Sequence, residues 1–159
     1  VSRSLAVAAS AHPAASAEYA AAVDQLLPFL SRACELKVLS ECAMYHLASC
    51  RVELFRFNLS LGRWSEAYAH VGALHTLALT ERQRTRSVFE HAEQGRHIEG
   101  ERVFAERVTD CLRMLVATLH ERGLLKLLGT LDAQAELGDE LEHVLLAHAR
   151  NSSVGEESL

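Results

Sequence analysis

Aromatic residues make up only 6% of this 159-residue chain, which also contains just two prolines and eight glycines. The hydrophobic share is nevertheless 49%, with many alanines and leucines, a composition typical of a well-packed helical protein and not of a disordered one. No stretch alternates apolar and polar residues for long enough to predict a sheet. A chain of this length is about one domain, and we expect it to be all-α with a real core.

Long apolar runs are missing, and none approaches the length of a membrane-spanning helix. The alanine-rich start between Leu5 and Ala11 is short and only weakly hydrophobic for the core of a signal peptide. The formal net charge of −5 gives no general attraction to nucleic acid or to anionic membranes. Because the chain has no initiator methionine, we interpret it as part of a longer protein.

The four cysteines contain no C-x-x-C pair and lie beside apolar residues within helical patterns: Cys34, Cys42, Cys50 and Cys111. This usage indicates buried thiols in a reducing compartment and not a secreted disulfide framework. Cys42, His46 and Cys50 are spaced four apart, but Cys42 and Cys50 lie roughly 12 Å apart along a straight helix. A single zinc ion, with ligand bonds of about 2.0–2.3 Å, cannot bridge them. We therefore predict packing positions here and no metal or other cofactor.

No catalytic constellation is visible in the sequence. Asp110, His120 and Glu121 are close in number, but the ten residues between Asp110 and His120 place these two at different heights on a helix. There is no serine elbow and no glycine loop of the kind that binds phosphate. We expect Glu121 and Arg122 to form salt bridges within a helical hairpin or to bind free carbonyl groups. The sequence predicts a protein that is not an enzyme.

A small group of arginines is the one basic feature of the chain: Arg82, Arg84, Arg86, Arg96 and Arg102. No aromatic residues are interleaved with it for base stacking, and Glu81, Glu90 and Glu93 dilute its charge. It indicates a solvated helix face or a contact with a partner protein, and not a nucleic-acid site.

The segment from Asp110 to Leu128 predicts a helical hairpin. Upstream of its glycine, apolar residues recur at steps of three and four: Phe104, Val108, Cys111, Leu115 and Leu119. Further apolar residues widen this stripe until the helix needs neighbours on two or more sides: Val103, Leu112, Met114 and Val116. Gly123 permits the left-handed conformation that ends a helix. We expect Leu112, Leu115, Val116 and Leu119 to form the inner core.

A second hairpin is predicted around Gly62. Helical spacing runs for five turns through Ala43, Leu47, Cys50, Leu54, Phe57 and Leu61. We expect Gly62 to stop this helix and Ser65 to cap the next, with Glu66 near its positive end. Gly-x-aromatic-x-Glu-Ala is the turn of tetratricopeptide-type hairpins, so Trp64, Ala67 and Tyr68 are predicted to lock it. Two hairpins stopped by glycine favour an α-solenoid of stacked antiparallel pairs over a closed bundle.

We expect about seven helices in three segments of the chain. Residues 1–14 are predicted to be a loosely structured lead-in, residues 15–150 the helical solenoid, and residues 151–159 a polar tail or linker. The predicted helices are 15–27, with Pro28 kinking it or starting a continuation to 36, then 40–61, 65–79, 80–92, 101–122, 124–131 and 138–150. A capping box of Thr80 and Gln83 starts the fourth, and 93–100 is predicted to be a loop.

Two blocks of sequence carry a family resemblance. The first is Leu-Phe-x-x-x-Leu-x-Leu-Gly-x-Trp-x-Glu-Ala-Tyr at 54–68, and the second is Asp-Cys-Leu-Arg-x-Leu-Val-x-x-Leu-x-Glu-Arg-Gly at 110–123. Leu127-Leu128, Gly138-x-Glu140-Leu141-Glu142 and Ala149-Arg150 continue them. Together, over roughly 51–150, they resemble the α-helical region of the hundred-and-sixty-kilodalton nucleoporin family, from the Y-shaped scaffold complex of the nuclear pore.

This resemblance implies a structural scaffold component of the outer rings of the nuclear pore, located in the nucleus at the nuclear envelope. Its partners would be other scaffold nucleoporins, with no small-molecule substrate, no direct contact with nucleic acid and no transmembrane segment. The assembly would support transport of mRNA and protein. Two departures from the family pattern are an added helix and polar loop between Leu74 and Gly100, and His120 in place of a cysteine. The alternative hypothesis is a tetratricopeptide-like adaptor that binds peptides or partner proteins in a concave groove.

Overall fold

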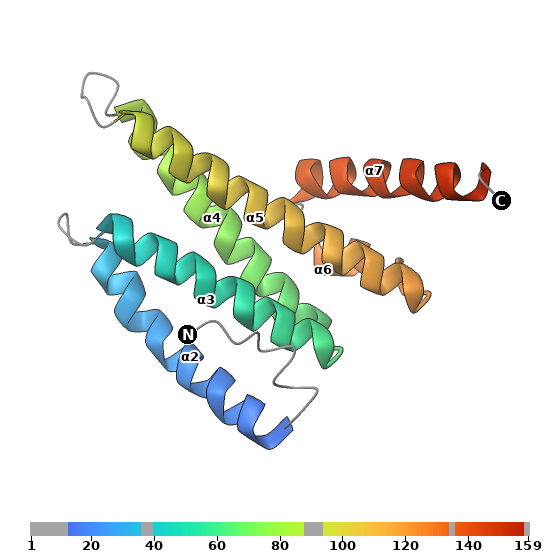
Figure 1. The fold of residues 1–159 in the computed structure, drawn as a ribbon, viewed down its shortest axis with the longest axis horizontal. Helices are drawn as coiled ribbons and strands as arrows, with labels where there is room; N and C mark the ends of the chain where they lie inside the picture. The colour runs from blue at the N-terminus through green and yellow to red at the C-terminus, as the bar shows by residue number, and fades with distance from the viewer. Residues whose placement is uncertain (1–12, 36–39, 88–93, 134–135, 158–159) are drawn as a thin grey trace.

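The computed structural model describes residues 13–35, 40–87, 94–133 and 136–157. Over these ranges the chain forms six helices and no strand, which confirms the all-α prediction (Figure 1). The helices are α2 (Pro13–Glu35), α3 (Ser40–Ser60), α4 (Trp64–Ser87), α5 (Gln94–Glu121), α6 (Leu127–Leu131) and α7 (Gly138–Glu157). No described helix is both long enough and apolar enough to cross a lipid bilayer.

Each of the first three described helices packs on the next one along the chain. α2 lies on α3, α3 on α4 and α4 on α5, while α7 crosses α5 and the short α6 contacts α4 (Figure 1). Packing between helices that are close in sequence needs only short connections and little loop-closure entropy. Of the two predicted hairpins, the one at Gly62 is such a pair, α3 with α4; at Gly123 the chain turns, but among the described helices α6 lies against α4 and not against α5.

Both glycine stops are present, and both have the same geometry. Gly62 has φ of 72° and Gly123 has φ of 69°, in the left-handed region that glycine adopts without steric cost. At the first turn the Arg63 N–H donates to the Asn58 carbonyl at 2.9 Å, and the Gly62 N–H donates to the Leu59 carbonyl at 3.2 Å. This pair of bonds is a Schellman motif, which satisfies carbonyl groups at the helix end.

The second turn repeats this bonding pattern at the end of α5. The Leu124 N–H donates to the Leu119 carbonyl at 2.7 Å, and the Gly123 N–H donates to the His120 carbonyl at 3.0 Å. The helix thus ends at the glycine because the chain reverses there with its last carbonyls already bonded.

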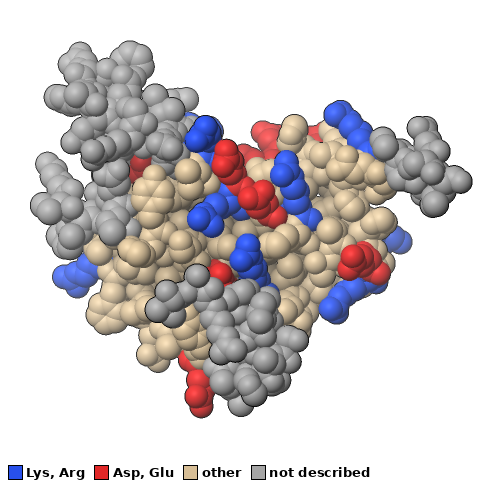
Figure 2. Space-filling view, viewed as in Figure 1, with Lys and Arg blue, Asp and Glu red and all other residues tan. Residues whose placement is uncertain are grey.

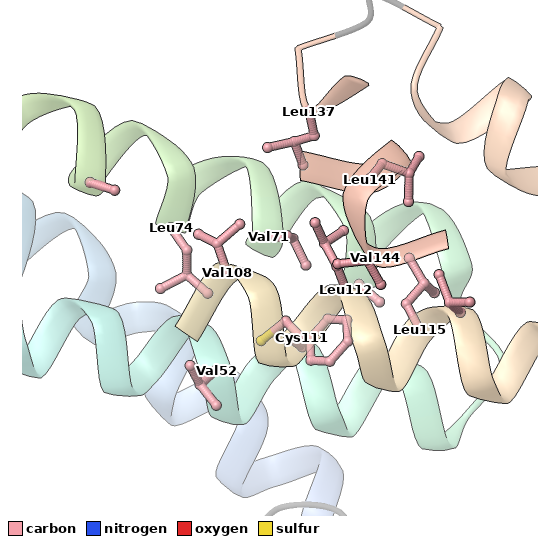
Figure 3. Packing of buried hydrophobic residues seen from close by; sticks show 14 of the residues in the cluster. Val52, Val71, Leu74, Val108, Cys111, Leu112, Leu115, Leu137, Leu141 and Val144 are labelled. Atoms are coloured by element: carbon pink, nitrogen blue, oxygen red, sulfur yellow. The ribbon is translucent and has the colours of Figure 1, made fainter. Parts of the chain in front are cut away.

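The main core lies where α3, α4, α5 and α7 meet (Figure 3). Leu112, Leu115, Val116 and Leu119 of α5 are fully buried in it, as is Ala67 of α4. Several leucines and valines from the other helices surround them, including Val52, Val71, Leu74, Leu137, Leu141 and Val144. The α5 stripe therefore has neighbours on more than one side, as its apolar width requires.

A smaller second cluster attaches α2 to α3. It is made of buried residues spaced along the facing sides of these helices: Ala20, Val23, Leu27, Leu47, Leu54 and Phe57. The opposite side of α2 exposes Leu26 and Phe29, with 52% and 74% of their surface accessible. The outer face of α2 therefore carries large apolar side chains that this part of the structure leaves accessible.

The first helix contains Pro28 without being split by it. α2 runs from Pro13 to Glu35 as one element, longer at its start than predicted. Pro28 lies on the exposed side of α2, where a missing helix hydrogen bond costs least because water can replace it. Of the predicted lead-in 1–14, residues 1–12 lie outside the described part.

The break predicted at Thr80 is wrong. α4 is a single helix from Trp64 to Ser87, and the Thr80 hydroxyl donates to the Thr76 carbonyl at 2.9 Å inside it. A threonine can bond the carbonyl four residues before it as well as cap a helix start, and here it does the former. The described residues accordingly hold six helices where about seven were predicted.

Four other boundaries also differ from the prediction. The short α6 begins at Leu127 and not at 124. Ser65 is not the cap of α4, because the Ala67 N–H donates to the Arg63 carbonyl at 3.0 Å and the helix begins at Trp64. Residues 94–100, predicted as part of a loop, are the first turns of α5. α7 continues to Glu157, into the predicted polar tail.

Candidate functional site

The two glycine turns lie at the same end of the molecule and contact each other (Figure 1). The guanidinium carbon of Arg122 stands 5.3 Å from the centroid of the Trp64 ring, which is a cation–π contact. Arg122 therefore stacks on the other hairpin, where the sequence predicted a salt bridge or a carbonyl contact. We call Gly62, Trp64, Arg122 and Gly123 the turn joint.

Tyr68 fixes a third segment beside this joint. Its hydroxyl donates to the Asp132 carboxylate at 2.6 Å, and the Leu137 N–H donates to the same oxygen at 3.2 Å. Asp132 follows α6 and Leu137 precedes α7, so one carboxylate ties the α6–α7 connection to α4. Burial, followed by the hydrogen bond to Asp132, raises the pKa of Tyr68 well above its ordinary value. Tyr68 thus remains a neutral donor at physiological pH.

A polar contact also lies between α3 and α4. Arg51 Nη1 donates to His70 Nδ1 at 3.1 Å, so this ring accepts at Nδ1. Burial and the neighbouring Arg51 charge lower the pKa of His70 to about 4. The ring therefore remains neutral at pH 7, as an acceptor of an arginine bond must be.

Two open grooves flank these contacts. One of about 520 Å³ lies between α2 and the α3–α4 hairpin, with walls formed by Ala17, Ala21, Phe57, Leu61 and His70 among others. The other, of about 470 Å³, lies between α4 and the α6–α7 connection beside Tyr68 and Asp132. The second groove contains the Tyr68 hydroxyl and the Asp132 carboxylate, which are hydrogen-bonded to each other at 2.6 Å.

The residues weighed for chemistry in the sequence do not assemble into one site. Asp110 lies 3.6 Å from Arg113, one turn along α5, and His120 is at the far end of that helix. His46 is exposed and Cys50 is half-buried, while the side chain of Cys42 lies outside the described part. Across the described residues, no group of three or more His, Cys, Asp or Glu side chains could hold a metal ion.

The basic group is only partly within the described side chains. Arg82 is exposed on α4, and Arg102 on α5 lies 3.8 Å from Glu106, while the side chains of Arg84, Arg86 and Arg96 lie outside the described part. Figure 2 shows Lys and Arg interspersed with Asp and Glu over the described surface of one face. Mixed charge of this kind suits a protein partner better than a polyanion.

Sequence reasoning missed one pair of histidines. His120 at the end of α5 and His148 on α7 approach to 2.9 Å between Nδ1 and Nε2, although 28 positions separate them. Asp132, the acceptor for Tyr68, was missed for the same reason, because Tyr68 lies 64 positions before it. No local spacing rule links residues so far apart, so no motif in the chain signals either contact.

Comparison with known proteins gave no relative: no family model, no curated protein and no solved structure matches the chain.

Proposed function

We propose that the protein is an α-solenoid scaffold segment of the hundred-and-sixty-kilodalton nucleoporin type, a structural component of the Y-shaped complex in the outer ring of the nuclear pore. In this proposal its partners are other scaffold nucleoporins, its location is the nuclear envelope, and its role is to support transport of mRNA and protein without chemistry of its own.

The turn joint is the observation that carries the proposal. The two sequence blocks that resemble the family, 54–68 and 110–123, contribute Gly62 and Trp64 from one side and Arg122 and Gly123 from the other. Residues that looked like two separate motifs thus belong to one contact between two hairpins. A family motif is expected where successive hairpins must hold a fixed angle, because stability in a solenoid comes from neighbouring repeats.

The order of packing supports the same proposal. α2, α3 and α4 each lie against the next helix, and the outer face of α2 leaves Leu26 and Phe29 accessible. In a solenoid, open apolar faces at the ends receive the next repeat or a partner.

Co-purification and imaging test this proposal. We expect the tagged full-length protein to give a rim of fluorescence at the nuclear envelope and to recover the other Y-complex subunits in near-stoichiometric amounts. Trp64→Ser combined with Arg122→Ser should reduce that recovery, while Arg107→Ser, which removes an exposed arginine elsewhere on α5, should not. A diffuse cytoplasmic signal and no recovered nucleoporin would reject the assignment.

One observation favours a tetratricopeptide-like adaptor as the second candidate. The groove of about 520 Å³ between α2 and the α3–α4 hairpin is large enough for a few peptide side chains. Ala17 and Ala21 on one wall leave room for a backbone to approach. In the same purification this function predicts chaperones or other peptide-bearing proteins, whose recovery depends on groove residues such as Phe57 and not on Trp64.

A further inference from the structure

His120 and His148 point at each other across the gap between α5 and α7. The two facing nitrogens, His120 Nδ1 and His148 Nε2, are 2.9 Å apart, and the ring centroids are 4.9 Å apart with an interplanar angle of 86°. Because the centroid distance exceeds the nitrogen distance by about the width of a ring, both nitrogens lie on the facing edges. The in-plane directions of the two nitrogens therefore point nearly head-on at each other, from different helices.

We propose that this histidine pair is a binding site for a divalent transition-metal ion, with Zn²⁺ as the ion it fits best. Imidazole nitrogen is a ligand that zinc prefers, and the pair is exposed, so a hydrated ion can reach it. The proposal is independent of the scaffold function and adds a ligand site to it.

The geometry needs only a small adjustment. Zn–N bonds of about 2.0–2.1 Å in a tetrahedral site place two ligand nitrogens about 3.3 Å apart. The nitrogens must therefore separate by a few tenths of an ångström, and each imidazole must rotate so that its lone pair points at the ion and not at the other nitrogen. His120 is exposed at the end of α5, where solvent leaves room for this rotation. Water fills the remaining zinc positions.

Zinc binding also changes which ring nitrogens carry hydrogen. In the metal-free pair one ring donates an N–H to the bare nitrogen of the other, so a single hydrogen lies between them. Zinc needs both facing nitrogens bare. The hydrogen therefore moves through solvent to the outward nitrogen of its own ring, which leaves His120 protonated at Nε2 and His148 at Nδ1 with no net proton release.

The ion would join two elements that already pack on each other further back along α7. α7 rests on α5 through Leu141 and Val144, and His75 of α4 lies 3.8 Å from Glu140 of α7. His148 lies one turn of α7 beyond Val144, so the pair is a polar contact between α5 and α7 beyond their apolar one. Zinc there would fix the angle at which α7 leaves the body of the molecule.

Thermal melts with and without ZnCl₂ test the proposal. Zinc should raise the Tm of the protein by roughly 2–4 °C at saturation, and titration calorimetry should give one Zn²⁺ per chain. His120→Ala and His148→Ala should each abolish the shift, and the double variant should match the single ones. Mg²⁺, which prefers oxygen ligands, should have no effect. The matched control is His143→Ala, an exposed histidine of the same helix, which should retain the shift.

Histidine ¹⁵N spectra give a second readout that does not depend on stability. On adding ZnCl₂, His120 should become the Nε2–H form and His148 the Nδ1–H form, while His143 stays unchanged. The proposal is overturned if wild-type protein binds no zinc, or if zinc binding is equal in wild type and both pair variants. Loss of the same size in the His143→Ala control would show scattered surface binding, and would overturn it too.

Discussion

Replacing glycine by alanine should have opposite effects on stability at two positions of this chain. Gly123 has φ of 69°, and a Cβ built there meets nothing within 4 Å, so the only cost of alanine is the left-handed backbone. Gly72 lies inside α4, where a Cβ also meets nothing within 4 Å and the backbone is helical. We expect Gly123→Ala to lower the free energy of unfolding by about 1 kcal/mol, and Gly72→Ala to raise it by roughly 0.5–1 kcal/mol.

Urea denaturation of Gly123→Ala and Gly72→Ala measures whether each change lowers or raises the free energy of unfolding. Gly123→Val should cost more than about 1 kcal/mol, because a β-branched residue tolerates positive φ least. An unchanged midpoint for Gly123→Val would mean that α5 ends by some other means.

Burial of His70 makes stability depend on pH in a stated direction. Its pKa is lowered from 6.5 to about 4 in the folded protein, so the unfolded chain takes up the proton first as the pH falls. The stabilisation is therefore complete above about pH 6.5 and is lost as the pH falls toward 4. Allowing for solvent screening of this half-buried ring, we expect wild type to lose about 1 kcal/mol more than His70→Gln between pH 7 and 4.5.

The glutamine variant retains an acceptor for Arg51 but cannot titrate. His143→Gln, at an exposed position on α7, is the matched control and should follow wild type. If the free energy of unfolding fell with pH in parallel for wild type and His70→Gln, the His70 ring would make no contribution to the pH dependence.

At the scale of single elements, Thr80 distinguishes two descriptions of α4. Its hydroxyl bonds the Thr76 carbonyl within a continuous helix, and its side chain is exposed. Thr80→Ala should therefore stabilise the protein by about 0.5 kcal/mol, because alanine has the higher helix propensity. If a helix began at Thr80, the same change would remove a cap and cost about 1 kcal/mol. Chemical denaturation separates the two outcomes, because the free energy of unfolding rises in the first case and falls in the second.

The contact between Trp64 and Arg122 joins two elements that are far apart in the chain. We expect a double-mutant cycle of Trp64→Leu and Arg122→Met to give a coupling free energy of about 0.5–1 kcal/mol, the size of an exposed cation–π contact. Arg113→Met, which removes an exposed arginine of α5 that lies near Asp110, should show no coupling with Trp64→Leu. If the two substitutions changed the free energy of unfolding additively, the contact between Trp64 and Arg122 would contribute no stability to the turn joint.

The helices that sequence patterns located best are those whose ends are set by local backbone chemistry. Gly62 and Gly123 stop α3 and α5 because positive φ is a property of one residue. The errors fall where a residue has two local uses, as at Thr80, which can cap a helix or bond back into it. The start of α5 was missed because its first turns are polar, with Gly95 and Gly100 among them, and its apolar stripe begins only at Val103.

At the scale of the whole molecule, the two hydrophobic clusters predict unequal stability. α2 is held by the smaller cluster, through Ala20, Val23 and Leu27, while α5 lies in the larger one. In native-state hydrogen exchange we expect the amides of α2 to be less protected than those of α4 and α5. Leu27→Ala should weaken protection in α2 alone, and Leu115→Ala should weaken it throughout. Equal protection in α2 and α5 would contradict this order.

The contacts that define the candidate site could not be predicted from the chain alone. Tyr68 finds Asp132 64 positions away, and His120 finds His148 28 positions away. Such pairs are set by how α6 and α7 return onto the body, which depends on the packing of Leu137 and Leu141 and not on any motif. By contrast, the residues of the turn joint were all named in advance, because each stands in or beside a glycine turn.

Cys111 has a practical consequence that follows from its place in the core. Its side chain is buried, and burial raises the pKa of its thiol to about 12, so the folded protein offers almost no thiolate to an alkylating reagent at neutral pH. Maleimide can modify it only during moments when the core opens. The rate at which maleimide adds to this native thiol therefore reports how often the core opens, and mass spectrometry reads the added mass without an engineered cysteine.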